Sequence, residues 1–389
     1  MDIKIYTQYL VHILKSAIEQ VTPNPIPENI DEGFLLRFAE FHKLLNIVYL
    51  TIGDRLSPES QKQLSELYNR SVYKSAAQQY YLEEVENALR DNKICYLVLK
   101  GKNLAELYPS EDMRQTADFD IYLGRENSKK AKEIMVALGF DIMSYTDTDE
   151  HDEYIIDKVA MCEIHPVLIQ NKHPWQEECN KITDRLLSTE KPYELKMSNE
   201  DFYLYNLAHT AKHMKVAGIG IRAFLDMWLI DRKYSSVIDR DVLDEKLKKA
   251  NLYEFDKNAR NLWEYWFCSK VPDDLTLAMA EYVAESGWVG TLNQMQSTDL
   301  AEAAGNANSV KTAKLKKYAS MFFISYEDMA DKYSVLKKHK WLLPFCYIYR
   351  FFNIILKKRD IMARVSDGLE SGDMQTGKAI VDLKKRIGL

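Results

Sequence analysis

The sequence contains little cysteine, glycine or proline, and each shortage excludes a class of protein. Its five cysteines are scattered, odd in number and without a C-x-x-C pair. This excludes a disulfide framework or a cysteine-rich zinc site and predicts a reducing compartment. Only 14 glycines and 10 prolines occur among 389 residues, which excludes collagen-like, low-complexity and turn-dense all-β architectures.

Long apolar runs are also missing. Charged residues interrupt the apolar pattern of residues 1–20, which is typical of an amphipathic helix rather than a signal peptide. The longest apolar run, Trp341 to Leu356, is broken by Pro344, Arg350 and Asn353. It is too short and too polar to span a bilayer. We therefore expect a soluble, cytoplasmic protein without stable membrane insertion.

The net charge of −6 hides an asymmetry along the chain. Residues 310–389 hold 17 basic and 8 acidic side chains, or +9, and residues 1–309 hold 35 and 50, or −15. The acidic body disfavours a long nucleic acid as partner. In the basic end, lysines flank an aromatic-rich segment, Trp341 to Phe352. Nucleic-acid binding and membrane-surface docking are open there, but we favour an amphipathic helix packed on the body with its lysines in water.

The chain divides into three regions by pattern, and its length exceeds the usual size of a single core. Residues 1–92 are helical in pattern, with apolar residues at three- and four-residue intervals in 59–91 and a further helical pattern at 32–55. Residues 93–192 mix one clear helix, 126–138, with short strand patterns at 94–99, 117–123, 140–145, 154–157 and 160–168. Residues 193–389 are helical again, with Ser198 and Asp201 as a capping pair. We therefore predict an α+β fold in which a small mixed-sheet core is inserted between N-terminal and C-terminal helical regions.

The informative side chains lie in the mixed region. Asp118 and Asp120 are two residues apart on a predicted strand, so their carboxylates project from one face. Two anions this close cost free energy unless a cation lies between them, and Mg²⁺ takes oxygen ligands. Glu163 and His165 share a face of a later strand by the same period. If the strands are neighbours, three carboxylates could hold two metal ions for phosphoryl chemistry; a solvated strand face is the alternative.

A second signal is the sequence Leu99-Lys100-Gly101-Lys102 at a predicted strand-to-helix junction. The glycine allows close backbone approach, and a helix N-terminus with two lysines suits phosphate. Taken alone, a Lys-Gly pair before a helix usually marks only a turn.

Together these motifs resemble a known family. The segments LVLKGKNLAELYPSEDMRQTADFDIYL, CEIH, LAHTAKHMK and IRAFLDMWLI are similar to the uncharacterised nucleotidyltransferase family of the DNA polymerase β superfamily. The similarity covers roughly residues 30–360. It implies a polymerase β-type core and transfer of a nucleoside monophosphate from an NTP, such as ATP, with Mg²⁺ or alternatively Mn²⁺ as cofactor.

The resemblance also implies roles for single residues. Asp118 and Asp120 would be the catalytic metal-binding pair and Glu163 the third carboxylate. Gly101, helped by Lys100, would hold the triphosphate.

Two further residues near the turn take roles from the resemblance. Arg114, four residues before Asp118, would face phosphate or brace the loop. The superfamily usually has Gly-Ser or Gly-Gly at the turn; here Lys102 follows Gly101, so a charge would replace the hydroxyl in binding the nucleotide.

The histidines allow two interpretations. His209 and His213 share a helix face with Lys212 close by, which suits either substrate recognition or structural hydrogen bonds between helices. A zinc protease is excluded because Thr210 replaces the glutamate of H-E-x-x-H. His165 is best placed to orient Glu163.

Three other residues of interest are interpreted as structural. We expect Arg222 and Asp226, four residues apart, to form an ion pair. His42 lies among the apolar positions of a predicted helix and is expected to be a core histidine.

The sequence thus predicts a nucleotidyltransferase that modifies a hydroxyl of an unidentified acceptor. We favour a small molecule as acceptor, with a protein or RNA as alternatives. A catalytically silent binding or scaffold protein is the second hypothesis, and a metal hydrolase using the histidine pair is the third. The base of the NTP and the oligomeric state are left open.

Overall fold

The computed structural model describes residues 2–145, 151–170, 173–288, 290–304, 323–333, 335–357 and 373–389. The chain forms two compact units, the first made of residues 1–213, 219–288 and 387–389 and the second of residues 214–218 and 289–386. The predicted boundaries after residues 92 and 192 both fall inside the first unit. They remain a proposal about how the sequence is organised.

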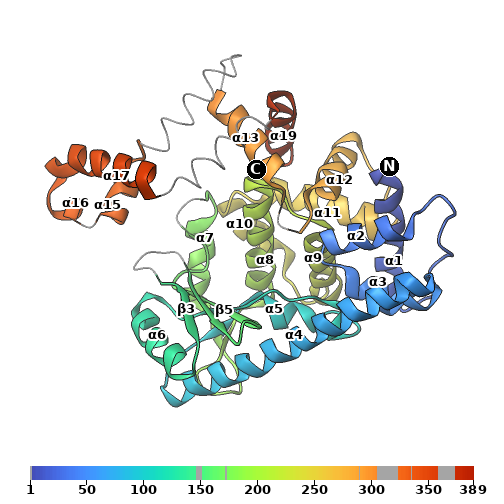
Figure 1. The fold of residues 1–389 in the computed structure, drawn as a ribbon, viewed down its shortest axis with the longest axis horizontal. Coiled ribbons are helices and arrows are strands. Elements are labelled where there is room, and N and C mark those ends of the chain that lie inside the picture. Colours follow the sequence, from blue (N-terminus) through green and yellow to red (C-terminus); the bar gives the residue numbers. More distant parts are fainter. Residues whose placement is uncertain are drawn as a thin grey trace. The chain divides into compact units, whose positions relative to one another are not determined.

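The N-terminal part of the first unit is helical (Figure 1). Its helices are α1 (Ile3–Glu19), α2 (Glu32–Phe41), α3 (Leu45–Ile52) and α4 (Pro58–Asp91). The helical pattern predicted over 32–55 is confirmed, but it forms two α-helices because the chain turns between α2 and α3. Lys43 there has a φ of 56°, a left-handed conformation that a right-handed helix cannot include.

A five-stranded mixed sheet follows, and it confirms the α+β class with a small mixed sheet. Its strands are β1 (Leu97–Val98), β2 (Phe119–Tyr122), β3 (Asp141–Ser144), β4 (Asp152–Ile156) and β5 (Ala160–His165). Their order is β1-β2-β5-β4-β3. Strands β2 and β5 run parallel, and the other neighbouring pairs are antiparallel.

The two faces of this sheet differ because side chains alternate along each strand. One face packs on α4 and on α6 (Ser128–Ala137), and its core includes Leu82, Val85, Phe119, Ile121 and Ile164. The residues between these strand positions point to the opposite face. Asp120, Glu163 and His165 are therefore excluded from the apolar core and gather on the other side of the sheet.

Further helices begin in the first unit. They are α5 (Lys100–Ala105), α7 (Gln176–Asn180), α8 (Asn199–Val216), α9 (Ile221–Tyr234), α10 (Arg240–Lys249), α11 (Tyr253–Phe267) and α12 (Asp274–Ser286), with a small ribbon of β6 (Leu187–Ser188) and β7 (Leu195–Lys196). The predicted capping pair is present at the start of α8, where the Asp201 backbone N–H donates to the Ser198 hydroxyl at 3.2 Å.

His42 is the core histidine that the sequence predicts. Its Nδ1 accepts from the Ile221 backbone N–H at 3.3 Å, and its Nε2 lies 3.1 Å from the Ala284 carbonyl oxygen. The ring therefore links the end of α2 to the start of α9 and to α12. A Cβ added at Gly220 would lie 2.5 Å from both the His42 ring and the Gly287 carbonyl oxygen, so this junction requires glycine.

The second unit contains helices only, among the residues described. They are α13 (Leu292–Ala304), α15 (Tyr326–Lys332), α16 (Val335–Lys338), α17 (Leu343–Lys357) and α19 (Met374–Arg386). Helices α13 and α19 cross closely, because a Cβ at Gly377 would lie 2.0 Å from the Ser297 carbonyl oxygen.

Within the described part of the chain, no helix has both the length and the apolar character needed to cross a bilayer.

Candidate active site

Three acidic residues lie side by side on the polar face of the sheet. Asp120 of β2 is opposite Glu163 of β5 in the parallel register, and Glu163 is opposite Glu153 of β4 in the antiparallel register. Like charges at neighbouring strand positions are destabilising unless cations or hydrogen-bond donors compensate them. The sheet therefore concentrates negative charge at one point.

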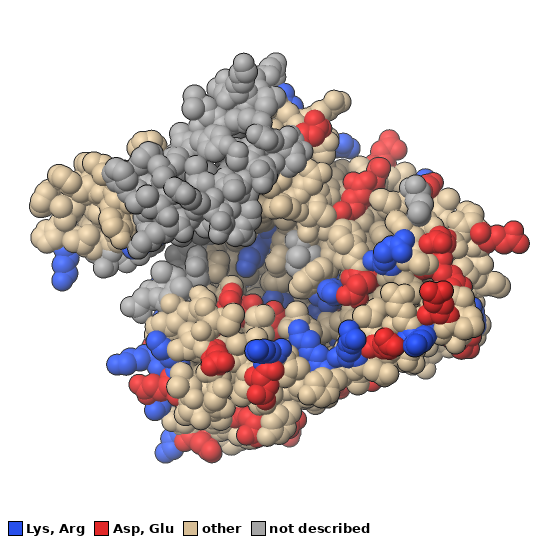
Figure 2. All heavy atoms as spheres, in the orientation of Figure 1, with Lys and Arg blue, Asp and Glu red and all other residues tan. Residues whose placement is uncertain are grey.

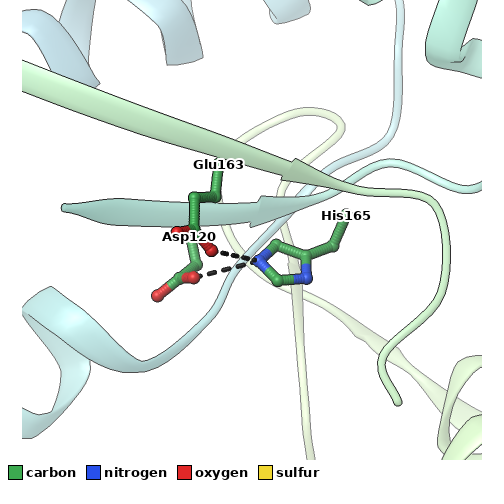
Figure 3. A group of neighbouring side chains, drawn as sticks. All are labelled: Asp120, Glu163 and His165. Carbon is green, nitrogen blue, oxygen red and sulfur yellow. Dashed lines mark hydrogen bonds and ion pairs between the residues drawn. The ribbon is translucent and has the colours of Figure 1, made fainter. Parts of the chain in front are cut away.

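His165 compensates part of this charge. Its Nε2 lies 2.9 Å from Asp120 Oδ1 and 3.4 Å from Glu163 Oε2, so the ring connects the two carboxylates (Figure 3). Burial by itself lowers the pKa of His165, but the hydrogen bonds to Asp120 and Glu163 outweigh burial and raise the pKa above its ordinary value. The imidazole thus holds both acids in a fixed orientation.

The pKa values of the two aspartates in the D-x-D motif are shifted in opposite directions. Burial, together with the charges of Asp120 and Glu163, raises the pKa of Asp118 to about 6. Burial would also raise the pKa of Asp120, but Lys100 and His165 outweigh it and hold the pKa well below its usual range. Asp120 is therefore the ionised partner of Lys100 in the salt bridge. Asp118, one residue before β2, binds a proton more readily because of burial and the neighbouring negative charges.

Lys100 connects this carboxylate group to helix α8. Its Nζ lies 3.6 Å from Asp120 Oδ2 and 2.7 Å from His209 Nε2, and His213 Nε2 lies 3.2 Å from His209 Nε2. Burial, reinforced by the charge of Lys100, lowers the pKa of His209 well below its ordinary value and that of His213 to about 3. A neutral His209 can accept a hydrogen bond from the Lys100 ammonium.

Lys212 lies between these two histidines in the sequence and is part of the same charged surroundings. Burial, followed by the charge of Lys100, lowers its pKa, while Glu163 and Asp120 act in the opposite direction. The structure therefore brings all three residues predicted on α8 to the polar face of the sheet.

The turn at Gly101 borders a cavity of about 140 Å³. Gly101, Lys102, Arg114 and Asp118 line one part of it, and residues of α4, including Gln79, line another. A Cβ at Gly101 would make only ordinary contacts, the nearest at 3.7 Å. Protein packing therefore does not require glycine at this position. Because Gly101 has no side chain, it leaves the backbone accessible from the cavity.

Arg114 braces the loop before β2. Its Nε and Nη2 donate to the two carboxylate oxygens of Asp226, both at 3.0 Å, and its Nη1 lies 3.4 Å from the Gly101 carbonyl oxygen. The predicted ion pair between Arg222 and Asp226 is wrong, because Asp226 pairs with Arg114. Arg222 donates instead to the Gln115 carbonyl oxygen at 2.8 Å, so both arginines secure the same loop to α9.

His151 and Glu153 are site residues that were not predicted from the sequence. His151 Nε2 lies 3.3 Å from Glu153 Oε1 and 3.7 Å from Glu163 Oε2, and its ring stacks on that of His165 with centroids 5.3 Å apart. The alternating pattern of β4 could have revealed Glu153 if the predicted strand had begun at residue 152 rather than 154.

Among the described residues, two groups have ligand atoms close enough to hold a metal ion. They are Asp120, Glu163 and His165, and His151, Glu153 and Glu163, with each group's ligand atoms within 4.8 Å of one another. Carboxylate oxygens suit Mg²⁺, and a set that includes imidazole also suits Mn²⁺ and related ions. The donor chemistry therefore fits a divalent metal.

A family model described as an uncharacterised nucleotidyltransferase matches residues 28–267. The chain belongs to this family. No curated protein matches the chain.

The nucleotidyltransferase match contains the whole candidate site, from Lys100 to Asp226, and ends where α11 ends at Phe267. Membership of this family makes the chain a transferase by relationship, with an NTP as the implied substrate. Residues after 267 lie outside the match, so the family says nothing about α12 or most of the second unit.

Proposed function

We propose that the chain is a Mg²⁺-dependent nucleotidyltransferase, with Mn²⁺ as the alternative cofactor, that transfers a nucleoside monophosphate from an NTP such as ATP to a hydroxyl group. One observation carries the proposal. Asp120 and Glu163 lie opposite each other in register, joined by His165, and Lys100 at the start of α5 lies 3.6 Å from Asp120. In the proposed site, a group that would bind a cation thus lies next to a lysine that would bind phosphate.

In this proposal Asp118, Asp120 and Glu163 hold the metal and His165 orients the last two. When bound, the metal neutralises the phosphate oxygens and activates the attacking oxygen. The low pKa of Asp120 supports this assignment, because that carboxylate is ready to bind a cation without first losing a proton.

The nucleotide would lie at the turn that follows β1. The cavity beside Gly101 and Lys102 is also lined by Leu82 and Phe119 of the apolar face of the sheet, so it opens away from Asp120 and Glu163. The triphosphate would instead pass the turn on the side where Lys100 approaches Asp120. Lys100 and Lys102 provide positive charge for it. Arg114 acts by positioning, because Asp226 already occupies its guanidinium and leaves it bracing the loop.

The proposed reaction transfers a nucleoside monophosphate group through its α-phosphorus. The acceptor's hydroxyl oxygen bonds to the α-phosphorus, the bond from that phosphorus to the bridging oxygen of the β-phosphate breaks, and pyrophosphate leaves. The hydroxyl proton passes to a carboxylate oxygen of the site. Lys100, already close to Asp120, would stabilise the negative charge of the departing phosphates.

We favour a small molecule as the acceptor, with a protein or RNA hydroxyl as alternatives. The charge of −15 over residues 1–309 opposes the approach of a long polyanion to the first unit. His209, Lys212 and His213 are proposed to contact substrate or, through Lys100, to position it.

The test is label transfer by the purified protein. Each α-labelled NTP is incubated with Mg²⁺ or Mn²⁺ and a fractionated cell extract, and label is sought on small molecules, protein and RNA. We expect transfer from at least one NTP. Asp120→Asn and Glu163→Gln should each reduce it by about 10³-fold or more, because each removes a charge that holds the metal.

Asp141→Asn is the matched control, since Asp141 is an exposed carboxylate on β3 of the same sheet and should leave transfer unchanged. Circular dichroism verifies that each variant is folded. If no NTP yields labelled product and none shifts the unfolding temperature, the enzyme proposal fails and a catalytically silent binding protein is favoured. Undiminished transfer by Asp120→Asn would refute the metal assignment.

A further inference from the structure

Helix α17 and the short turn before it expose a continuous apolar face. Trp341, Phe345, Ile348 and Tyr349 are 69%, 61%, 56% and 59% exposed, respectively. Their spacing of four, three and one residues places them on one side of the helix. The rings of Trp341 and Phe345 contact edge to face with centroids 6.4 Å apart, so the face begins as one aromatic surface.

The opposite side of α17 is apolar as well, and it is already occupied. Leu342, Leu343, Cys346 and Tyr347 pack on a small core that contains Met329 and Leu336. The Tyr347 hydroxyl donates to the Ile324 carbonyl oxygen at 2.5 Å. Because this packing fixes which side of the helix faces inward, the exposed face cannot be buried by rotating α17.

The sequence of α16, α17 and their flanks is rich in positive charge, although Asp331 and Asp360 border this segment. Residues 332–359 contain eight basic residues and no Asp or Glu. The basic residues are Lys332, Lys337, Lys338, Lys340, Arg350, Lys357, Lys358 and Arg359. In Figure 2 the surface over α15–α17 is mostly uncharged, with Lys or Arg at its edge. An apolar face bordered by positive charge fits a partner that is both apolar and anionic.

We propose that α17 docks on the surface of an anionic lipid bilayer. The helix would lie in the plane of the interface with Phe345 and Ile348 among the acyl chains. Trp341 and Tyr349 would lie at the headgroup level, which their amphipathic rings prefer. Lysines on the flanks would attract the anionic headgroups. Such docking needs no membrane-spanning helix.

Other occupants fit the face less well. Grooves for single-stranded nucleic acid combine aromatic stacking with cations along the bound strand, whereas here the face includes Ile348 and the lysines border it. A second copy of the chain would bring another segment of the same positive charge against the first, which is repulsive.

The experiment is vesicle flotation with the full chain. Wild-type protein is mixed with vesicles of pure phosphatidylcholine, or of phosphatidylcholine with about a third of phosphatidylglycerol, and centrifuged on a density gradient. We expect the protein to float with the anionic vesicles only. Raising the salt from about 0.1 M to about 0.5 M should weaken binding, because it screens the lysines.

The variant combines Phe345→Ser, Ile348→Ser and Tyr349→Ser, and it should lower the fraction bound to anionic vesicles by about tenfold or more. Val271→Ser is the matched control, because Val271 is an apolar residue that is 87% exposed in the first unit. The proposal is overturned if wild-type protein floats with neither kind of vesicle, whatever the result for the variant. So does tight binding of a labelled oligonucleotide that the vesicles do not displace, or a wild-type dimer that the triple variant dissociates.

Discussion

Lys100 is held from two sides, by the Asp120 carboxylate at 3.6 Å and by the His209 imidazole at 2.7 Å. A lysine side chain has several rotatable bonds and loses much conformational entropy when it is fixed in one place. The imidazole reduces this cost at the moment of substrate binding, because it keeps the ammonium directed at the carboxylates beforehand. In the proposed reaction His209 is therefore a positioning residue that acts through Lys100.

His209→Ala should lower kcat/KM for the NTP by about 10²-fold, because displacement of a reacting group by about 1 Å costs that much. His209→Gln should retain more activity, since its amide oxygen can still accept from the ammonium. Steady-state transfer kinetics with the labelled NTP check both variants. Equal losses in the two, or an Ala variant as active as wild type, would contradict the positioning role.

At the level of secondary structure, part of the site could be predicted from strand period alone. The two-residue repeat correctly places Glu163 and His165 on one face, and the order of strands brings them to Asp120. Glu153 and His151 were missed because their proximity depends on the register between β4 and β5. The contact of Lys100 with His209 joins residues 109 positions apart, and no local pattern carries that information.

The break between α2 and α3 is a feature that local periodicity could not predict. The helical pattern of 32–55 continues through the turn, so the sequence alone does not locate the break. Long-range contacts decide otherwise, since His42 at this turn binds the Ile221 backbone N–H and lies against Gly220. Tertiary packing of one side chain thus outweighs local helical preference.

His42 predicts a pH-dependent stability. Burial lowers its pKa to about 4, although the Ala284 carbonyl acts in the opposite direction. The unfolded chain accepts a proton near pH 6.5, and the folded chain does so only near pH 4. The neutral ring therefore contributes fully above about pH 6.5, and its contribution falls by about 2 kcal/mol by about pH 5. Urea unfolding across this range measures the loss.

His42→Gln should be less stable than wild type at pH 7 but should lose less stability between about pH 6.5 and 5. His209 and His213 contribute to the pH dependence of the free energy of unfolding in both proteins. The difference between the two pH dependences therefore gives the contribution of His42. A His42→Gln variant with the full wild-type pH dependence would show that this dependence arises elsewhere.

For the whole molecule, the net charge of −6 combines regions with different roles. Asp118, Asp120, Glu153 and Glu163 belong to the acidic 1–309 part of the chain and lie in the region that matches the family. The basic segment around α17 lies outside that match. Catalysis and the proposed membrane docking are therefore separable properties, and a variant of one should leave the other intact.

If the crowded carboxylates hold a divalent ion as proposed, the stability of the first unit should depend on that ion. A divalent ion bound only by the folded state raises the free energy of unfolding by about 2.7 kcal/mol at a hundred times its Kd. We expect Mn²⁺ to raise the unfolding temperature more than Mg²⁺, because His151 adds an imidazole to the oxygen ligands of the second candidate group. EDTA should reverse the effect. Glu163→Gln should abolish most of it while Asp141→Asn retains it, since only Glu163 belongs to both candidate ligand groups. Equal stabilisation of wild type and Glu163→Gln would place the ion outside this sheet.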